Sequence, residues 1–363
     1  MSLTNKRKET VKHRMKKIAK PFMLIFTLLV ILALSILYRE IGHQENNSIP
    51  VLRYVKQDSI HHNTLLDNYY SCFISIYLDK NTKFDRNKIP VQEIKGQLYY
   101  HPIFMSQLAL GAYEYYLSTQ DLNAYNTFIR CACWLRDNLK QHGRFYYWEF
   151  TFENDQFPGG AYKVPWVSAM AQGEGAAVLT KAFAVTGDNQ FLYAAKKAIQ
   201  PVLHDVSEGG ISIVAGNEYI FPQEYLTIHP SSILNGGISS FFGIYEYYMV
   251  TRDQSIKHAC DVMLKTFYTA LDRYDNGYWS LYSQWPPAWV APPHYQTVHV
   301  QQLYYLYLIS GDRKFLIYST KFRDYQDNWI NRTRYVLSNH LRQVRQFSFK
   351  KIPKIVQFLK TPY

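Results

Sequence analysis

The stretch QEYLTIHPSSILNGG, residues 223–237, places a carboxylate, Glu224, beside a phenol, Tyr225, shortly before an apolar run that opens near Asn235. A carboxylate can accept a proton and a phenol can return one, so this combination suits general acid–base catalysis. The structural alternative is that an acid just before a helix start serves as a cap or an ion-pair partner. The residue types alone leave both interpretations open.

Other polar residues occupy similar positions. Gln172 and Glu174 stand at the start of a second expected helix, where they either contact sugar hydroxyls or cap the helix. His299 and Gln302 are three residues apart and therefore share one helix face, either as pocket lining or as satisfied core residues. Three tryptophans are candidates for stacking on sugar rings: Trp148, Trp166 and Trp285. Close helix packing is the expected role of four glycines: Gly173, Gly175, Gly236 and Gly237.

A repeated unit must position these side chains. Four segments each begin with a proline, run into an apolar helix and stop at a polar turn, and a second helix follows. The prolines are Pro102, Pro165, Pro230 and Pro293, at spacings of 63, 65 and 63 residues. Short strand-like pieces such as GGISIVAGNEYIF, with a Gly-Asn turn at 216–217, separate the helical pairs. Pairs of this kind bury their apolar faces by stacking around a ring.

The expected fold is therefore mainly α: an (α/α) toroid or incomplete barrel over residues 101–335. Its short β-hairpins should lie on one rim together with the 223–237 stretch. Residues 51–100, which contain SCFISIYLD and GQLYY, are expected to form a small β segment before the ring. Residues 336–363 form a basic C-terminal tail.

The first 50 residues predict a membrane anchor. Residues 1–20 are strongly basic, and residues 21–38, PFMLIFTLLVILALSILY, contain no charge and are long enough to span a membrane. The positive-inside rule places the N-terminus in the cytoplasm, and residues 39–50 form a stalk. A cleaved signal peptide is the alternative, but no small-x-small cleavage site follows. We therefore expect a single-pass anchor whose toroid faces a bacterial periplasm or the Golgi lumen.

The composition favours a carbohydrate ligand. The chain has 32 Tyr, 21 Phe and 7 Trp, and aromatic side chains fill cores but also hold sugar rings. The formal net charge of +12 suits a polyanion, although much of it lies in residues 1–20. Because basic residues do not alternate with aromatics in a nucleic-acid pattern, no nucleic-acid partner is expected. The sequence leaves open whether the chain forms a homodimer.

Over residues 95–330 the sequence resembles the D-glucuronyl C5-epimerases, which act on heparan sulfate and heparosan-type chains. Five segments carry the resemblance in the family's order: HPIFMSQLALGAY, WVSAMAQGEGAAVLTKAF, EYLTIHPSSILNGG, YDNGYWSLY and HYQTVHVQQL. The resemblance implies an α/α toroid that epimerises uronates within a polymer and needs no cofactor or metal. The catalytic glutamate falls on Glu224, and the two catalytic tyrosines fall on Tyr282 and Tyr295. The implied substrate-binding residues are Tyr225, Gln172, Glu174, His299, Gln302, Asn235 and Trp166.

One departure from the family concerns charge. Where the family has Tyr-Asp-Leu-Arg-His, this chain has Tyr282-Ser283-Gln284-Trp285, so an arginine is missing. The expected reaction type does not depend on this arginine, but the identity of the polymer is left open. The alternatives are a polysaccharide lyase on the same ring and a non-catalytic protein that binds acidic glycans. A glycoside hydrolase is less favoured, because the sequence offers no convincing second carboxylate to pair with Glu224; Asp155 and Glu174 are left open for that role.

Overall fold

The computed structural model describes residues 66–154, 163–227, 229–284 and 288–339. The expected anchor at 21–38, the basic segment, the stalk and most of the C-terminal tail lie outside these ranges. Among the described residues, no helix is both long and apolar enough to cross a membrane. The chain divides into two units, and residues from Ile49 to Asp327 belong to one of them. In the other unit, the described part is a helix over residues 329–339.

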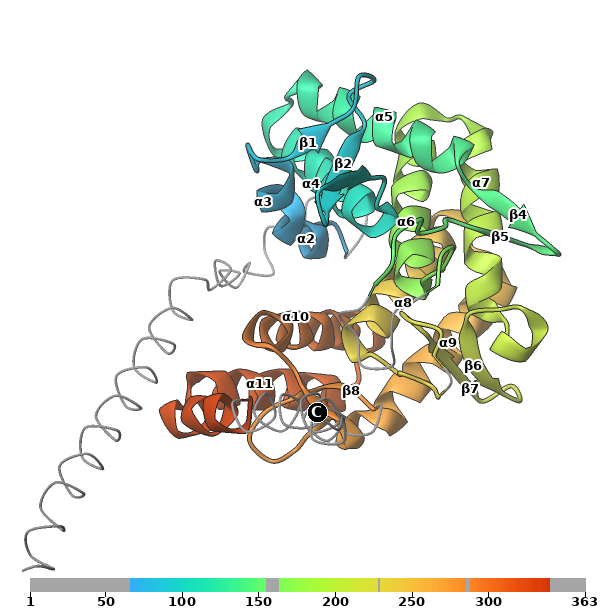
Figure 1. Cartoon of the computed structure of the whole chain (residues 1–363). Helices are drawn as coiled ribbons and strands as arrows, with labels where there is room; N and C mark the ends of the chain where they lie inside the picture. Colours follow the sequence, from blue (N-terminus) through green and yellow to red (C-terminus); the bar gives the residue numbers. More distant parts are fainter. Residues whose placement is uncertain (1–65, 155–162, 228, 285–287, 340–363) are drawn as a thin grey trace, which may run out of the picture. The chain divides into compact units, whose positions relative to one another are not determined.

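Four helical pairs follow one another along the chain, as the repeat predicts (Figure 1). The first helices of the pairs pack in sequence order, α4 on α6, α6 on α8 and α8 on α10, and each second helix packs on its own first helix. This arrangement confirms a mainly helical fold built from stacked pairs. The pairs are α4 (Pro102–Thr119) with α5 (Leu122–Asp137), α6 (Ala169–Thr186) with α7 (Asn189–Ile199), α8 (Leu234–Thr251) with α9 (Gln254–Ala270), and α10 (Pro293–Ser310) with α11 (Arg313–Asp327).

The turn inside each pair has the same construction. The first helix ends on a residue in the left-handed conformation, and an aspartate then accepts a hydrogen bond from the backbone N–H two residues further on. The left-handed residues are Gln120, Gly187, Arg252 and Gly311, with φ of 60°, 72°, 55° and 73°. The aspartates are Asp121, Asp188, Asp253 and Asp312. One backbone device therefore reverses the chain in all four repeats.

Helices α6 and α8 make the closest backbone contact among the first helices. A Cβ on Gly243 would lie 1.8 Å from the carbonyl oxygen of Gly173, and a Cβ on Gly173 would lie 2.4 Å from Cα of Ser240. Glycine is therefore required on both sides of this crossing. Gly175 faces the ring of Trp148 in the same way. The predicted packing role is thereby confirmed for Gly173 and Gly175, and Gly243 is a further glycine of the same crossing.

Two-stranded hairpins separate the pairs, as expected from the strand-like pieces. The middle hairpin turns at Gly216, whose φ is +55°, and pairs Ala215 with Tyr219. The location of the hairpins on one common rim stays a prediction. The strands are β4 (Lys140–His142) with β5 (Phe145–Tyr147), β6 (Ser212–Ala215) with β7 (Tyr219–Pro222), and β8 (Leu281–Ser283) with β9 (Trp289–Val290); 3₁₀ turns η3 (Gln200–Leu203), η4 (Val206–Glu208) and η5 (Leu271–Tyr274) complete the links.

The segment before the first pair differs from expectation. SCFISIYLD does not form a strand: α2 (Asp67–Tyr70), η2 (Ser71–Phe73) and α3 (Ile74–Tyr77) are helical. Tyr70, Phe73 and Tyr77 have the spacing of one helix face and pack on the core, which explains the helical form. The expected β structure is confined to a three-stranded antiparallel sheet, β1 (Lys83–Phe84), β2 (Pro90–Ile94) and β3 (Gln97–Tyr99).

Candidate active site

Glu224 is the second residue after β7, and Gln223 between them fixes the loop in place. The backbone N–H of Gln223 donates to Ile211 O at 2.9 Å, and its carbonyl accepts from Ala169 N–H, at the start of α6, at 3.1 Å. Its side-chain Oε1 accepts from the backbone N–H of Ser232 at 3.0 Å. These bonds hold Glu224 between the beginnings of α6 and α8.

The carboxyl group of Glu224 is 4 % exposed and rests against the first turn of α8. A Cβ on Gly236 would come within 2.2 Å of Oε2, so glycine at this position makes room for the acid. Burial raises the pKa of Glu224 to about 7, opposed by a hydrogen bond from Tyr225. Oε2 has no hydrogen-bond partner. Glu224 can therefore exchange a proton near neutral pH.

Tyr282 on β8 and Tyr295 on α10 form the opposite part of the cluster. Their ring centroids are 4.8 Å apart, and their hydroxyls are hydrogen-bonded to each other. Burial, with the charge of Glu224 as the next contribution, raises the pKa of Tyr295 to about 12 and that of Tyr282 well above its usual value. Both phenols therefore carry their protons at neutral pH.

Gln296 fixes the segment that carries Tyr282 to the helix that carries Tyr295. Its side-chain Oε1 accepts from the backbone N–H of Ser280 at 3.0 Å and from the Ser280 hydroxyl, while its Nε2 donates to Phe322 O at 2.7 Å. The indole N–H of Trp279 donates to Ala291 O at 2.8 Å. The hairpin that carries Tyr282 is thereby fixed to the helix that carries Tyr295.

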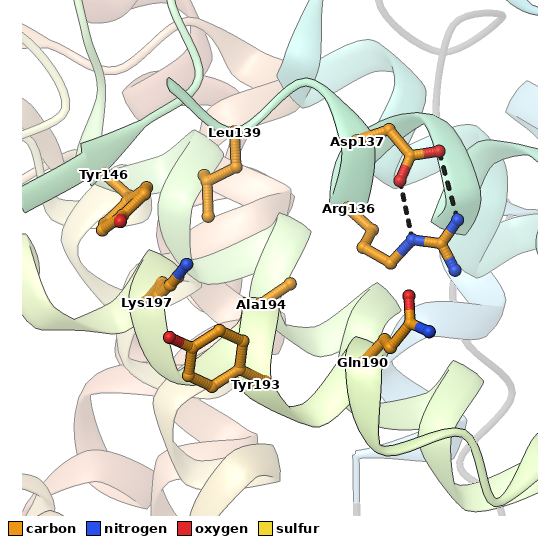
Figure 2. Close-up of a pocket in the computed structure, with 8 residues that line it drawn as sticks. All are labelled: Arg136, Asp137, Leu139, Tyr146, Gln190, Tyr193, Ala194 and Lys197. Carbon is orange, nitrogen blue, oxygen red and sulfur yellow. Dashed lines mark hydrogen bonds and ion pairs between the residues drawn. The ribbon is translucent and has the colours of Figure 1, made fainter. Parts of the chain in front are cut away.

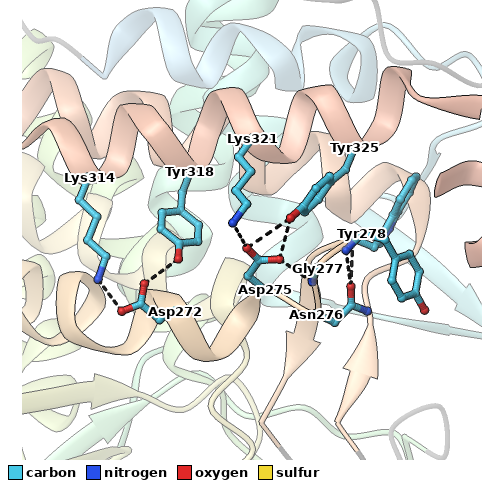
Figure 3. A network of polar contacts seen from close by, with 10 residues as sticks. Asp272, Asp275, Asn276, Gly277, Tyr278, Lys314, Tyr318, Lys321 and Tyr325 are labelled. Atoms are coloured by element: carbon cyan, nitrogen blue, oxygen red, sulfur yellow. Dashed lines mark hydrogen bonds and ion pairs between the residues drawn. The ribbon is translucent and has the colours of Figure 1, made fainter. Parts of the chain in front are cut away.

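Helix α11 holds the base of the same hairpin (Figure 3). Asp272 accepts from Tyr318 at 2.6 Å and lies 2.9 Å from Lys314 Nζ. Asp275 pairs with Lys321 at 2.5 Å and also accepts from the backbone N–H of Gly277. The YDNG segment thus forms the turn that leads into β8.

Glu174, on the first turns of α6, brings a second carboxyl group to the cluster. It is 2 % exposed, and Oε1 accepts from Gln107 Nε2 of α4 at 3.3 Å. Its pKa is raised to about 8, chiefly by burial and in part by the nearby charge of Glu224, while hydrogen bonds from Gln107 and Ser239 oppose the shift. Oε2 has no partner. The cluster thus contains two buried carboxyl groups that influence each other.

His299 and Gln302 are buried on α10, where their side chains contact residues of the elements that carry the cluster. His299 Nδ1 is 2.8 Å from the Ser280 hydroxyl, and burial lowers its pKa to about 3, so the ring is neutral. Gln302 Nε2 donates to Asn235 O, Ser239 Oγ and the Tyr69 hydroxyl. Several buried polar atoms here have no partner: His299 Nε2, Gln302 Oε1, Asn235 Oδ1 and Ser283 Oγ.

Not all of the predicted residues join the cluster. The side-chain amide of Gln172 accepts from the backbone N–H of Trp148 at 3.0 Å. It donates to the carbonyl oxygens of Tyr146 and Ala198 at 2.9 and 2.8 Å. Because the whole amide is committed to backbone groups, Gln172 binds the β5 hairpin to α6 and α7, and its expected contact with substrate is replaced by this structural role. It is the counterpart of Gln296 in another repeat.

The tryptophans divide in a similar way. Trp148 is 1 % exposed and donates to Leu135 O, so it is a core residue and has no face available for a sugar. Trp166 stacks on Phe150 at 3.8 Å, donates to Phe152 O and approaches Tyr225 at 5.7 Å, which places it at the edge of the cluster. Trp285 lies outside the described residues.

Sequence reasoning missed three residues that hold the carboxyl groups: Gln107, Gln223 and Ser239. A signal existed for Gln107, because it is one of few polar residues in the apolar helix HPIFMSQLALGAY. Gln223 precedes the acid directly and could have been singled out by its position. Nothing in the sequence indicates that Ser239 of α8 meets Glu174 of α6, since that meeting depends on the close crossing at Gly173 and Gly243.

A pocket also opens between α5, the β4–β5 hairpin and α7 (Figure 2). In it, Arg136 pairs with Asp137 at 2.7 Å, and Lys197 Nζ lies 4.2 and 4.3 Å from the ring centroids of Tyr146 and Tyr193. It contains neither the carboxyl pair nor the tyrosine pair. The cluster around Glu224 is therefore the candidate active site.

Known proteins show what this arrangement is related to. A family model described as the D-glucuronyl C5-epimerase C-terminus matches residues 140–324. The chain belongs to the D-glucuronyl C5-epimerase family. This match contains Glu174, Glu224, Tyr282 and Tyr295.

Two curated relatives share 30 % identity with this member of the D-glucuronyl C5-epimerase family. One is the D-glucuronyl C5-epimerase of Caenorhabditis elegans, over 224 residues that make up 56 % of this chain and 34 % of the relative. The other is an uncharacterized protein of Methanocaldococcus jannaschii, over 183 residues, 50 % of this chain and 58 % of the relative. The chain thus spans about a third and somewhat more than half of these two proteins.

Solved structures agree on the fold. A cellobiose 2-epimerase from Bacillus thermoamylovorans superposes with a TM-score of 0.51 at 16 % identity, covering 71 % of this chain and 69 % of that one. At this identity the likeness concerns architecture alone. It places this member of the C5-epimerase family in the α/α toroid class, as expected from the sequence.

Proposed function

We propose that the protein is a polysaccharide C5-epimerase that converts D-glucuronate into L-iduronate, or an analogous uronate pair, within a polymer. The family supports a carbohydrate epimerase. The observation that supports this reaction most directly is the pairing of a buried acid, Glu224, with the neutral phenols of Tyr282 and Tyr295. An epimerase needs a base on one face of the sugar and an acid on the other.

In the proposed mechanism, ionised Glu224 removes the C5 proton. The electron pair of the C5–H bond enters the carboxylate as an enolate, to which Tyr282 donates a hydrogen bond. Tyr295 then delivers its phenolic proton to C5 from the opposite face. The enzyme is left with a protonated Glu224 and a Tyr295 phenolate.

The hydrogen bonds in the cluster suit the reset of these two groups. Tyr295 is bonded to Tyr282, and Tyr225 is bonded to Glu224. Protons moving along these phenols, or exchanging with solvent, return Glu224 to the carboxylate and Tyr295 to the phenol. The half-buried positions of Tyr225 and Tyr295 leave this part of the cluster open to a substrate.

The test is incubation of the chain from residue 46 onward with a heparosan-type polymer in heavy water. We expect deuterium at C5 and some inverted residues, with a loss of 10²-fold or more in Tyr295→Phe and in Glu224→Gln. Tyr307→Phe, on the same helix but away from the cluster, is the matched control and should retain activity.

Other outcomes would contradict the proposal in distinct ways. An unsaturated product without inversion would mean a lyase. Cleavage with a new reducing end would mean a hydrolase, for which Glu174 now supplies the second carboxyl group that the sequence left open. Binding without exchange, cleavage or elimination would mean a glycan-binding protein.

The membrane anchor also remains a proposal. Residues 21–38 are proposed to hold the epimerase at a membrane with the described unit outside the cytoplasm, where the growing glycan emerges. Protease accessibility in sealed vesicles tests this orientation. Complete protection of the epimerase unit in right-side-out vesicles would contradict it.

A further inference from the structure

Substrate binding in the candidate site would bring two negative groups close together. A uronate carboxylate has to bind next to Glu224, which is itself anionic when it acts as the base. Among the described residues, no lysine or arginine forms an ion pair with Glu174 or Glu224 or contributes to their pKa values. The buried cation of α6, Lys181, lies two turns from Glu174 and is paired with Glu246 at 3.4 Å.

The neighbouring loops do not supply a cation. Residues 155–162 and 285–287, which directly follow Asn154 and Gln284, contain no lysine or arginine in the sequence. The family's arginine near this point is absent as well. Among the described residues beside the two acids, the groups that could hold the substrate carboxylate are therefore neutral hydrogen-bond donors.

Glu174 has the geometry of such a donor. Gln107 Nε2 donates to its Oε1, the Ser239 hydroxyl also interacts with the carboxyl group, and its buried Oε2 makes no hydrogen bond in the protein. The titratable groups that influence it or that it influences are anionic or neutral: Glu224, Tyr295 of α10, and Tyr69 and Cys72 of the α2–η2 segment. Oε2 makes no hydrogen bond within the protein, and a bound carboxylate would supply an acceptor for an O–H on it.

We propose that Glu174 works as a neutral carboxylic acid whose Oε2 hydroxyl donates a hydrogen bond to the uronate carboxylate of the substrate. The protonated acid thus takes the place of a cation. Two neighbouring buried carboxyl groups ionise one after the other, so the protein can hold Glu174 protonated while Glu224 is ionised. The pKa order of about 8 and about 7 agrees with this division of roles. The inference rests on the proposed function for the identity of the ligand as a uronate.

Binding rather than turnover gives the sharpest test. The probes are a heparosan-type polymer and the same polymer with its carboxyl groups reduced to alcohols, titrated against Glu224→Gln so that turnover and the second carboxyl are both removed. We expect affinity for the acidic polymer to fall about tenfold or more as pH rises from 7 to 9, because ionised Glu174 loses its donor and repels the ligand. The reduced polymer should show no such fall.

Two variants then isolate Glu174. In Glu224→Gln/Glu174→Gln, the amide still donates but does not ionise, so the fall with pH should disappear while affinity at pH 7 stays within about threefold. In Glu224→Gln/Glu174→Leu, the donor is lost, so affinity should already be about tenfold lower at pH 7. Glu224→Gln/Glu114→Gln, which changes another buried glutamate, should keep the original pH dependence.

The outcomes separate this inference from the proposed function. An unchanged pH dependence in Glu224→Gln/Glu174→Gln, or equal behaviour of the Gln and Leu variants in folded protein, would overturn the role of Glu174. If wild-type protein shows no C5 exchange while binding follows Glu174 as described, the epimerase proposal is wrong and the carboxylate contact stands. Circular dichroism on each variant confirms that loss of binding does not reflect loss of the fold.

Discussion

At the scale of single residues, the site is defined by two acids that the protein keeps away from water. The ordinary pKa of a glutamate is 4.5. In Glu174 and Glu224 the pKa is higher, and burial is the largest cause of the increase. Such groups are unfavourable for stability when ionised, because the folded state resists a charge that the unfolded state accepts freely. The two acids should therefore lower the free energy of unfolding when they are ionised, and this effect should be measurable.

We predict that Glu224→Gln becomes more stable relative to wild type as pH rises. The pKa of Glu224 is higher in the folded state, so between about pH 4.5 and 7 the folded state binds more protons than the unfolded state. The contribution of Glu224 to the free energy of unfolding of the wild type must then fall as pH rises, and the glutamine variant lacks this contribution. Urea titrations at pH 5 and pH 8 measure the difference.

The control for this prediction is Glu218→Gln, since the Glu218 side chain is 81 % exposed. Its effect on stability should hardly change between the two pH values. A constant effect of Glu224→Gln across the same range would show that Glu224 is not desolvated in the folded protein.

At the scale of helices and turns, the repeat carried most of the information that the sequence offered. Prolines, polar turns and strand-like pieces predicted the four pairs and their hairpins because these signals are local. SCFISIYLD was misjudged because its aromatic residues suit both a strand and a short helix, and its burial against the core decided between them. Glu224 beside Tyr225 was visible in the sequence. Glu174 beside Glu224 was not, because helix packing brings them together across 50 residues of chain.

The left-handed turn residues lead to a paired prediction. Gly311→Ala should lower stability by about 1 kcal/mol, since a Cβ in the left-handed region is unfavourable although no atom lies within 4 Å of it. Gln120→Gly places glycine at the equivalent turn, where φ is 60°, and should raise stability by up to about 1 kcal/mol. Thermal unfolding measures both. Effects of the same sign would mean that the two turns are not equivalent.

At the scale of the whole described unit, the short helices before the first pair connect distant parts of the chain. Tyr69 of α2 accepts from Gln302 of α10 and packs on Phe242 of α8 at 4.7 Å and on Tyr305 at 5.4 Å. Segment α2 also contacts α4. The beginning of the unit therefore holds its last pair against the earlier ones.

We predict that Tyr69→Ala lowers the free energy of unfolding by about 3 kcal/mol or more, because it empties a buried site shared by three helices. Tyr193→Ala, at a side chain that is 63 % exposed, should change it by less than about 0.5 kcal/mol. Equal effects in chemical denaturation would show that α2 contributes little to holding the pairs together.

The glycine crossing of α6 and α8 has a mechanical consequence. Because Gly243 and Gly173 are in backbone contact, these two helices cannot slide past each other without a clash. We therefore expect them to move as one rigid body, called the plate below. Glu174 belongs to this plate, and Glu224 rests on it through Gly236. Tyr282 and Tyr295 belong to the α10–α11 pair instead. A widening between α8 and α10 that admits a polymer would therefore move Tyr282 and Tyr295 relative to the acids, against the hydrogen bonds from Gln302 to α8, and it would separate the two sides of the proton exchange. This movement predicts that backbone amides in β8 and in the first turn of α10 exchange with solvent faster than those in α6 and α8, which amide hydrogen exchange can measure.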